Sequence, residues 1–167
     1  MNDDALRSIM TRLALLETRI DRAASADVLY EDVNTWTPTF AGTGTAGTFT
    51  YQFQAGYYQQ VGSWLFLSAL LGITAITVAP TGNLQIGGIP LLNAATTVYG
   101  GLTFHTYVGL TLSAGYVNLH ANLIAPASTS VITQSGSNVA TIALPAANLV
   151  LVGGIARIWI TGSFFLT

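Results

Sequence analysis

The sequence has no cysteine and no lysine, and its charge is confined almost entirely to one end. Of five basic and seven acidic side chains, eleven lie between Asp3 and Asp32, and only Arg157 follows them. Without cysteine the chain has neither a disulfide framework nor a thiolate metal site. Without Asp or Glu, the last 135 residues lack the paired carboxylates of glycosidases and the acid that orients histidine in a Ser/His/Asp triad. We therefore expect no catalytic residues and no enzyme activity.

The low charge also limits the partners and cofactors that we expect. A net charge of -2 with 7% charged residues offers no basic surface for nucleic acid. His105 and His120 have no cluster of further ligands around them in the sequence, so we expect no metal ion and no other cofactor. The apolar stretch 61–79 contains Gly62, Gly72 and many β-branched residues, which predicts buried strands and no membrane insertion. The first residues show no apolar segment followed by a cleavage site, so no secretory signal peptide is expected.

The N-terminal segment 1–24 carries an apolar repeat with alternating spacings of three and four residues. This spacing is the a/d pattern of a coiled coil, flanked by Arg12 and Glu17. The segment 12–17 also resembles the Arg-h-x-x-h-Glu signature of short three-stranded coiled coils, in which h is apolar. The predicted homotrimer contacts are Leu6, Ile9, Arg12, Leu13, Leu16, Glu17 and Ile20. The alternative is a helix packed on its own domain, because Met10 and Leu15 would widen the apolar stripe.

After a neck or linker at 25–38, which ends in the extended dipeptide Thr37-Pro38, the sequence changes to short runs with period-two alternation. Such runs predict strands, and the turns between them are expected at 80–83, 87–90, 100–101 and 135–138. The predicted strands are 48–53, 57–61, 64–71, 73–78, 83–86, 98–107, 115–124, 130–134, 140–144 and 155–166. The predicted fold is an all-β body, an antiparallel, jelly-roll-like β-sandwich at 39–167, preceded by the α-helical coiled coil.

The alternation is clearest in the predicted strand 115–124, which we interpret as having one core face and one polar face. The core face would hold Val117, Leu119, Ala121 and Leu123. The candidates for contact with a partner or a glycan are Tyr116, Asn118, His120, Asn122 and, as the only ion of the body, Arg157. Each has a structural alternative: a histidine ring hydrogen-bonded within the sheet, and an ion pair between Arg157 and an acid of the neck. Those neck acids are Asp27, Glu31 and Asp32.

Aromatic residues are the other candidates for sugar binding, because their rings can stack on sugars beside amide groups. They are Trp36, Trp64, Trp159, Tyr57, Tyr58, Tyr99, Tyr107 and Tyr116. Aromatic residues of strands are also common in cores and subunit interfaces. The sequence therefore leaves both roles open for them.

Several motifs of the body resemble structural proteins of tailed bacteriophages. They are W-x-P-x-φ at 36–40, G-x-Y-x-x-φ-G-x-φ-φ-φ around 56–66, G-x-φ-x-φ-x-G-φ-P at 82–90 and the closing strand 158–167, where φ is apolar. The resemblance implies a trimeric β-sandwich of the kind found on capsid decoration proteins, head fibres and the ends of tail fibres or spikes. Because only a short coiled coil precedes the body, we expect a capsid decoration or cement protein in the virion. Its partners would be its own copies, the major capsid protein or other virion proteins; the alternative is a tail-fibre or head-fibre tip that binds host-surface glycan.

Overall fold

The structure, a computed structural model, describes residues 12, 14, 15, 17, 33–90, 98–122 and 129–166. The chain divides into two compact units, Met1–Glu31 and Asp32–Thr167, and the second unit is called the β domain below. The four described residues of the first unit have helical backbone. The apolar seam of the predicted coiled coil lies outside the described residues, so the coiled coil and the trimer stay predictions.

The described part of the β domain forms ten strands and one short 3-10 helix, and all strand pairs are antiparallel. The all-β prediction is thus confirmed. The strands are β1 (Asn34–Trp36), β2 (Thr39–Gly42), β3 (Thr48–Val61), β4 (Trp64–Val78), β5 (Leu84–Gly87), β6 (Val98–Val108), β7 (Asn118–Asn122), β8 (Thr129–Gly136), β9 (Val139–Ala143) and β10 (Ala156–Leu166), with η1 at Ala146–Asn148. No helix among the described residues is long and apolar enough to cross a membrane.

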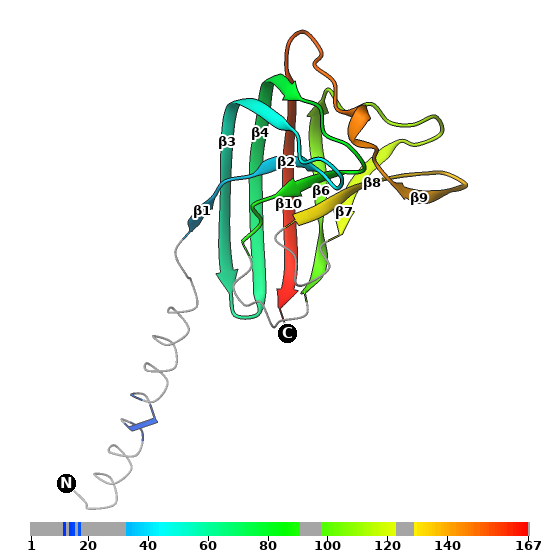
Figure 1. The fold of residues 1–167 in the computed structure, drawn as a ribbon. Coiled ribbons are helices and arrows are strands. Elements are labelled where there is room, and N and C mark those ends of the chain that lie inside the picture. The colour runs from blue at the N-terminus through cyan, green and yellow to red at the C-terminus, as the bar shows by residue number, and fades with distance from the viewer. Residues whose placement is uncertain are drawn as a thin grey trace, which may run out of the picture. The chain divides into compact units, whose positions relative to one another are not determined.

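The strands follow one another in a single sheet with the order β1-β3-β4-β10-β6-β7-β8-β5-β2, and β9 pairs with β8. The two end strands, β1 and β2, are consecutive in the chain and are separated only by Thr37 and Pro38. The sheet must therefore curl until its two ends meet, and Figure 1 shows β2, β5 and β8 crossing in front of β4, β10 and β6. This single curled sheet differs from the predicted jelly roll, in which two separate sheets face each other.

The link between the two end strands explains the W-x-P-x-φ motif. Pro38 is buried and has no N–H, so it can turn the chain from β1 into β2 without leaving a backbone donor unpaired. Its carbonyl oxygen accepts a hydrogen bond from Nε2 of Gln54 at 2.9 Å. Gly88, at φ 78°, allows the backbone to pass so close to Thr37 that a Cβ atom would collide with the Thr37 carbonyl oxygen. The motif thus closes the curl of the sheet.

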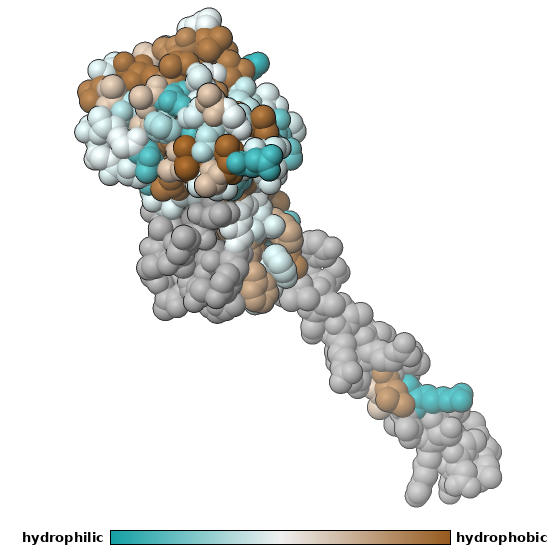
Figure 2. Space-filling view, turned by 90° about the vertical axis from the view of Figure 1, so that its right-hand side faces the viewer, coloured by the Kyte–Doolittle hydropathy of each residue, from teal (hydrophilic) through white to brown (hydrophobic). Residues whose placement is uncertain are grey.

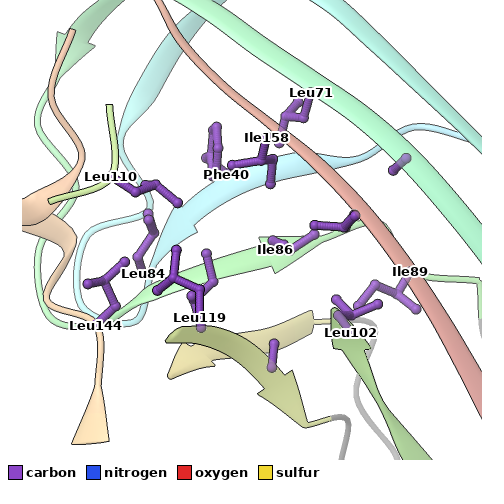
Figure 3. Packing of buried hydrophobic residues seen from close by; sticks show 14 of the residues in the cluster. Phe40, Leu71, Leu84, Ile86, Ile89, Leu102, Leu110, Leu119, Leu144 and Ile158 are labelled. Atoms are coloured by element: carbon purple, nitrogen blue, oxygen red, sulfur yellow. The ribbon is translucent and has the colours of Figure 1, made fainter. Parts of the chain in front are cut away.

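The hydrophobic core lies inside this curl, where inward side chains of both halves of the sheet meet. Figure 3 shows Leu71 and Ile158 on one side and Phe40, Ile86 and Leu119 on the other. Alternate residues of β4 and β10 face this core, as the burial along both strands shows. Each fully buried Leu, Ile or Phe contributes about 1.5–3 kcal/mol relative to an exposed position. The buried faces of β4 and β10 together form one wall of the core.

Two sequence-predicted breaks are strand residues in the structure. Gly72 lies within β4. A glycine is needed at this position because the Phe53 ring occupies the space that a Cβ atom would need. Gly100 and Gly101, predicted to form a turn, lie within β6. A Cβ on Gly100 would collide with the backbone of Ser163, so the glycine permits close pairing with β10. Glycine in a strand can also mark the close approach of a neighbouring side chain or strand, as it does at both places.

Polar groups in the core are paired. Among the described residues, no buried side-chain nitrogen or oxygen lacks a hydrogen-bond partner. Gln134, which is fully buried, accepts a hydrogen bond from the Ser113 N–H at 2.8 Å and donates one to Ser113 Oγ at 2.9 Å. The Tyr51 hydroxyl accepts a hydrogen bond from the Phe40 N–H; burial raises the pKa of this hydroxyl, and the hydrogen bond opposes that rise. These bonds connect loops and strands that are distant in the sequence.

We expect Gln134→Leu to destabilise the protein by about 1–3 kcal/mol, because Ser113 would lose both partners of its N–H and hydroxyl. The free energy of unfolding in urea, followed by circular dichroism, measures this loss. Gln52→Leu is the matched control because Gln52 is exposed on β3, and its effect should stay within about 0.5 kcal/mol. Equal effects of both variants would contradict the role of the Gln134–Ser113 pair.

Candidate functional site

The outward surface of four neighbouring strands, β3, β4, β10 and β6, carries large exposed apolar side chains, and we call this surface the outer face. Trp64, Phe66 and Trp159 are 47%, 47% and 50% exposed. They alternate along β4 and β10 with fully or nearly fully buried residues such as Leu65 and Ile158. Period-two alternation places them on the side opposite to the core. A soluble domain normally buries such rings, so their exposure marks this face as a contact surface.

A row of polar side chains crosses the outer face at right angles to the strands. Pairing in register joins Tyr57 of β3 to Ser68 of β4, Ser68 to Thr161 of β10, and Thr161 to Thr103 of β6. The row continues through His120 of β7 to Thr133 of β8. We call these six residues the polar row. It provides hydroxyl and imidazole groups across six adjacent strands.

Aromatic side chains lie on both sides of the polar row. On one side, the Trp64 ring stacks on Phe66 with centroids 6.3 Å apart and meets the Phe165 ring edge-on at 5.2 Å. On the other side, Trp159 and Leu70 are direct neighbours across β10 and β4. The centroid of the Trp159 ring lies 5.2 Å from that of His105. The outer face therefore combines apolar platforms with a central polar row.

A β-bulge aims His105 at this surface. Register between β10 and β6 shifts after Trp159, which pairs with Thr106, while Ile160 pairs with Phe104. His105 is the extra residue, and both it and Thr106 are exposed. Bulges often redirect a side chain in this way. The redirected ring lies against Trp159, and its Nε2 shares a hydrogen bond of 2.6 Å with Thr161 Oγ1, so it connects the aromatic platform to the polar row.

Among the hollows on the outer face, two are lined in part by β10. The first, about 400 Å³, overlaps the polar row and is lined by Phe66, Gly101, Thr103, Thr161 and Ser163 together with Leu67 and Gly162. The second, about 280 Å³, is lined by Phe53, Leu70, Thr106, Arg157, Ile158 and Trp159. Aromatic walls with a few convergent polar groups are typical of small-molecule and sugar sites. The first hollow offers hydroxyls, and the second offers a cation.

A different apolar surface lies at the end of the β domain where the connection from η1 to β10 turns. Figure 2 shows apolar side chains gathered over this end, where Val150, Leu151 and Val152 are exposed. The turn at Gly153 and Gly154 has positive φ at both residues. These three exposed side chains are aliphatic and provide no ring or polar group that could orient a sugar. The outer face is therefore the better candidate for a binding site.

The structure places the sequence-predicted contact residues on two different surfaces. His120 belongs to the polar row, and Asn122 pairs with Gly101 beside the first hollow. Arg157 lines the second hollow. Asn118 is exposed and pairs with Ser135 of β8. The Tyr116 hydroxyl instead donates a hydrogen bond to the Ala140 carbonyl at 3.0 Å, toward β9 and away from these hollows.

The predicted core face of strand 115–124 is correct only in part. Leu119 and Ala121 are buried as predicted, whereas Val117 is 63% exposed. The prediction for Val117 is wrong because β7 begins only at Asn118, and Val117 lies in the connection before it, outside the regular alternation of the strand. Leu123 lies outside the described residues.

Sequence reasoning missed Phe66, Phe165 and the serine and threonine hydroxyl groups of the polar row. The run 64–67 is apolar throughout and Phe165 follows another Phe, so the sequence does not tell which face of either strand lies in the core. Of the three tryptophans considered as sugar contacts, Trp36 is buried, while Trp64 and Trp159 are exposed. The predicted trimer contacts Arg12 and Glu17 are helical and exposed. Leu6, Ile9, Leu13, Leu16 and Ile20 lie outside the described residues.

The described residues offer little acid–base or metal chemistry. No three His, Cys, Asp or Glu side chains of the described residues gather at one place. His105 bonds to a threonine hydroxyl, and the described part of the β domain contains no carboxylate that could orient it. The outer face is therefore suited to binding through stacking and hydrogen bonds.

Comparison with protein-family models and with curated proteins gives no match for the sequence. Among solved structures, the fold is similar to part of the crystal structure of Dettilon tailspike protein (gp208), with a TM-score of 0.66 and 17% sequence identity. The likeness covers 81% of this chain and 24% of that chain, so this chain spans about a quarter of the tailspike's length. At this level of identity the two proteins share a fold.

Proposed function

We propose that the protein is a bacteriophage virion component of the tail-fibre or tailspike type, and that its outer face binds a glycan on the host surface without cleaving it. The observation that carries the binding role is the half-exposed Trp159, held by His105 beside the polar row. A ring with a fixed orientation next to hydroxyl groups can stack on a sugar while the hydroxyls bind its polar edge.

The fold likeness supports the tail location over the capsid. The similar structure is named a tailspike protein, whereas the capsid decoration role predicted from the sequence gains no support from it. In the proposed virion, the first unit joins three copies through the predicted heptads, and other virion proteins hold the trimer. The sequence has no carboxylate after Asp32, which supports binding without hydrolysis.

Antibody labelling of purified particles, viewed by electron microscopy, tests the location. We expect label on the tail. Label on the capsid shell would overturn the tail assignment, and particles without label would overturn the virion role.

Binding of the fluorescent full-length protein to host cells and to their purified surface polysaccharide tests the proposed site. We expect Trp159→Ala and Phe66→Ala each to weaken binding about tenfold or more, because each removes an exposed platform beside the first hollow or the polar row. Ile142→Ala is the control, since Ile142 is an exposed apolar residue on β9. Wild-type protein that binds neither cells nor polysaccharide would refute the glycan role, and newly formed reducing ends would refute binding without cleavage.

A further inference from the structure

We propose that the glycan is anionic, with a carboxylate or phosphate bound by Arg157 and the adjoining sugar ring stacked on Trp159. This inference rests on the proposed function and adds the chemical class of the ligand. It concerns the second hollow, which contains the only formal charge of the sequence after Asp32.

The first argument is charge. The described part of the β domain contains no Asp and no Glu, so no carboxylate side chain there can neutralise Arg157. A guanidinium remains charged at any physiological pH. Arg157 is exposed, so its charge is free to meet an anion from solvent, a ligand, Asp32, the first unit or another chain.

The second argument is the position of Arg157 in the sheet. β10 is paired on both sides, and Arg157 lies opposite Gly72 of β4 and Val108 of β6. Gly72 presents no side chain of its own, and its neighbour across the hollow is the Phe53 ring. The backbone that carries Arg157 is thus fixed by two ladders, and the Phe53 ring covers Gly72 beside it, so an aromatic ring borders the cation. The position of its Cα atom therefore does not change when the side chain binds an anion.

The third argument is the apolar surroundings of this charge. Phe53, Leu70 and Trp159 line the same hollow, and Thr106 is its one neutral polar side chain. Charge-assisted hydrogen bonds gain strength where apolar groups exclude water. Arg157 and Trp159 are two residues apart on the same face, which puts their Cα atoms about 7 Å apart. A sugar ring stacked on Trp159 can therefore place its carboxylate or phosphate substituent at Arg157.

An ion pair with Asp27, Glu31 or Asp32 of the chain itself is the competing explanation. It predicts that loss of Arg157 changes stability or assembly, whereas a ligand site predicts that it changes binding. The two explanations are therefore distinguished by measurement of both properties on the same variants.

The experiment compares a uronate-containing host-surface polysaccharide with its carboxyl-reduced form, in which each uronate has become a neutral sugar, and includes a phosphorylated saccharide as a third probe. Binding to the 167-residue protein is measured by calorimetry for wild type, Arg157→Gln, Arg157→Lys and the control Arg19→Gln. The control removes the same charge from the N-terminal segment. Thermal unfolding is recorded for every variant.

We expect wild type to prefer a charged probe, and Arg157→Gln to weaken that binding about 10- to 100-fold at unchanged melting temperature. Arg157→Lys should recover part of the loss, because lysine keeps the charge but not the planar fork. Equal binding of charged and carboxyl-reduced saccharide, unaffected by Arg157→Gln, would overturn the inference and leave the proposed function intact. A lower melting temperature or loss of the trimer with unchanged binding would assign Arg157 to the neck acids. Wild type that binds no saccharide would refute the proposed function itself.

Discussion

Phe164→Ala is expected to lower the free energy of unfolding by about 3–5 kcal/mol, whereas Phe165→Ala should cost only about 1 kcal/mol. The two residues are consecutive on β10 but face opposite sides of the sheet. Phe164 is fully buried in the core. Phe165 is partly exposed on the outer face and meets the Trp64 ring at 5.2 Å. The difference between the variants therefore measures which side of β10 holds the core.

The cost at Phe164 is large because its removal leaves a cavity that the surrounding strands cannot fill. β10 pairs with β4 on one side and β6 on the other, so neither neighbour can move inward without loss of ladder hydrogen bonds. A loss of this size approaches the total stability of many domains. Phe164→Leu, with an expected loss of about 1.5 kcal/mol, keeps the comparison measurable if the alanine variant does not fold.

Urea unfolding at one fixed protein concentration, followed by circular dichroism, measures these losses, since assembly would make stability depend on concentration. Phe165→Ala serves as the control because it removes the same atoms from the adjacent position. Losses of similar size at both positions would contradict the assignment of the two faces. A larger loss at Phe165 would indicate that the outer face is buried in an assembly.

The positions of the strands were largely predictable from the sequence, and their arrangement was not. Period-two alternation identified 98–107 and 155–166 almost as observed, because local alternation reflects the pleat of a single strand. The predicted pairs 48–53 with 57–61 and 64–71 with 73–78 are single strands, β3 and β4. The predicted strands left gaps at 54–56 and at Gly72, although Gly56 and Gly72 lie within strands and each accommodates an aromatic ring.

The candidate site was less predictable because its residues come together only through register. Tyr57, Thr103 and Thr161 are distant in the sequence, and their place in one row depends on which residues pair across three ladders. A shift of one residue in any ladder would send these side chains into the core. His120 and Arg157 could be named from their chemistry alone. Their position relative to the exposed tryptophans could be determined only from the fold.

Trp36→Ala is expected to destabilise the protein by about 3–5 kcal/mol, because the buried Trp36 side chain packs β1, the first strand of the sheet, against β3. It is 8% exposed and lies directly opposite Gly56 in the β1–β3 ladder. Its indole N–H donates a hydrogen bond to the Ser68 carbonyl at 3.3 Å. A Cβ on Gly56 would collide with the indole ring, so the ring covers the space that glycine leaves empty. Covering a strand glycine with a cross-strand aromatic ring offsets the cost of that glycine.

A double-mutant cycle of Trp36 and Gly56 distinguishes a direct contact between the two residues from a general loss of packing. Gly56→Ala alone should cost about 1–3 kcal/mol, because the new methyl group displaces the indole ring. In the Trp36→Ala background the same change should become neutral or stabilising by up to about 1 kcal/mol, since alanine is then the better strand residue. The double-mutant cycle, measured by urea unfolding, should therefore give a coupling energy of about 2 kcal/mol. Additive effects would mean that Trp36 does not lie over Gly56, and the closure of the sheet through β1 would then need a different anchor.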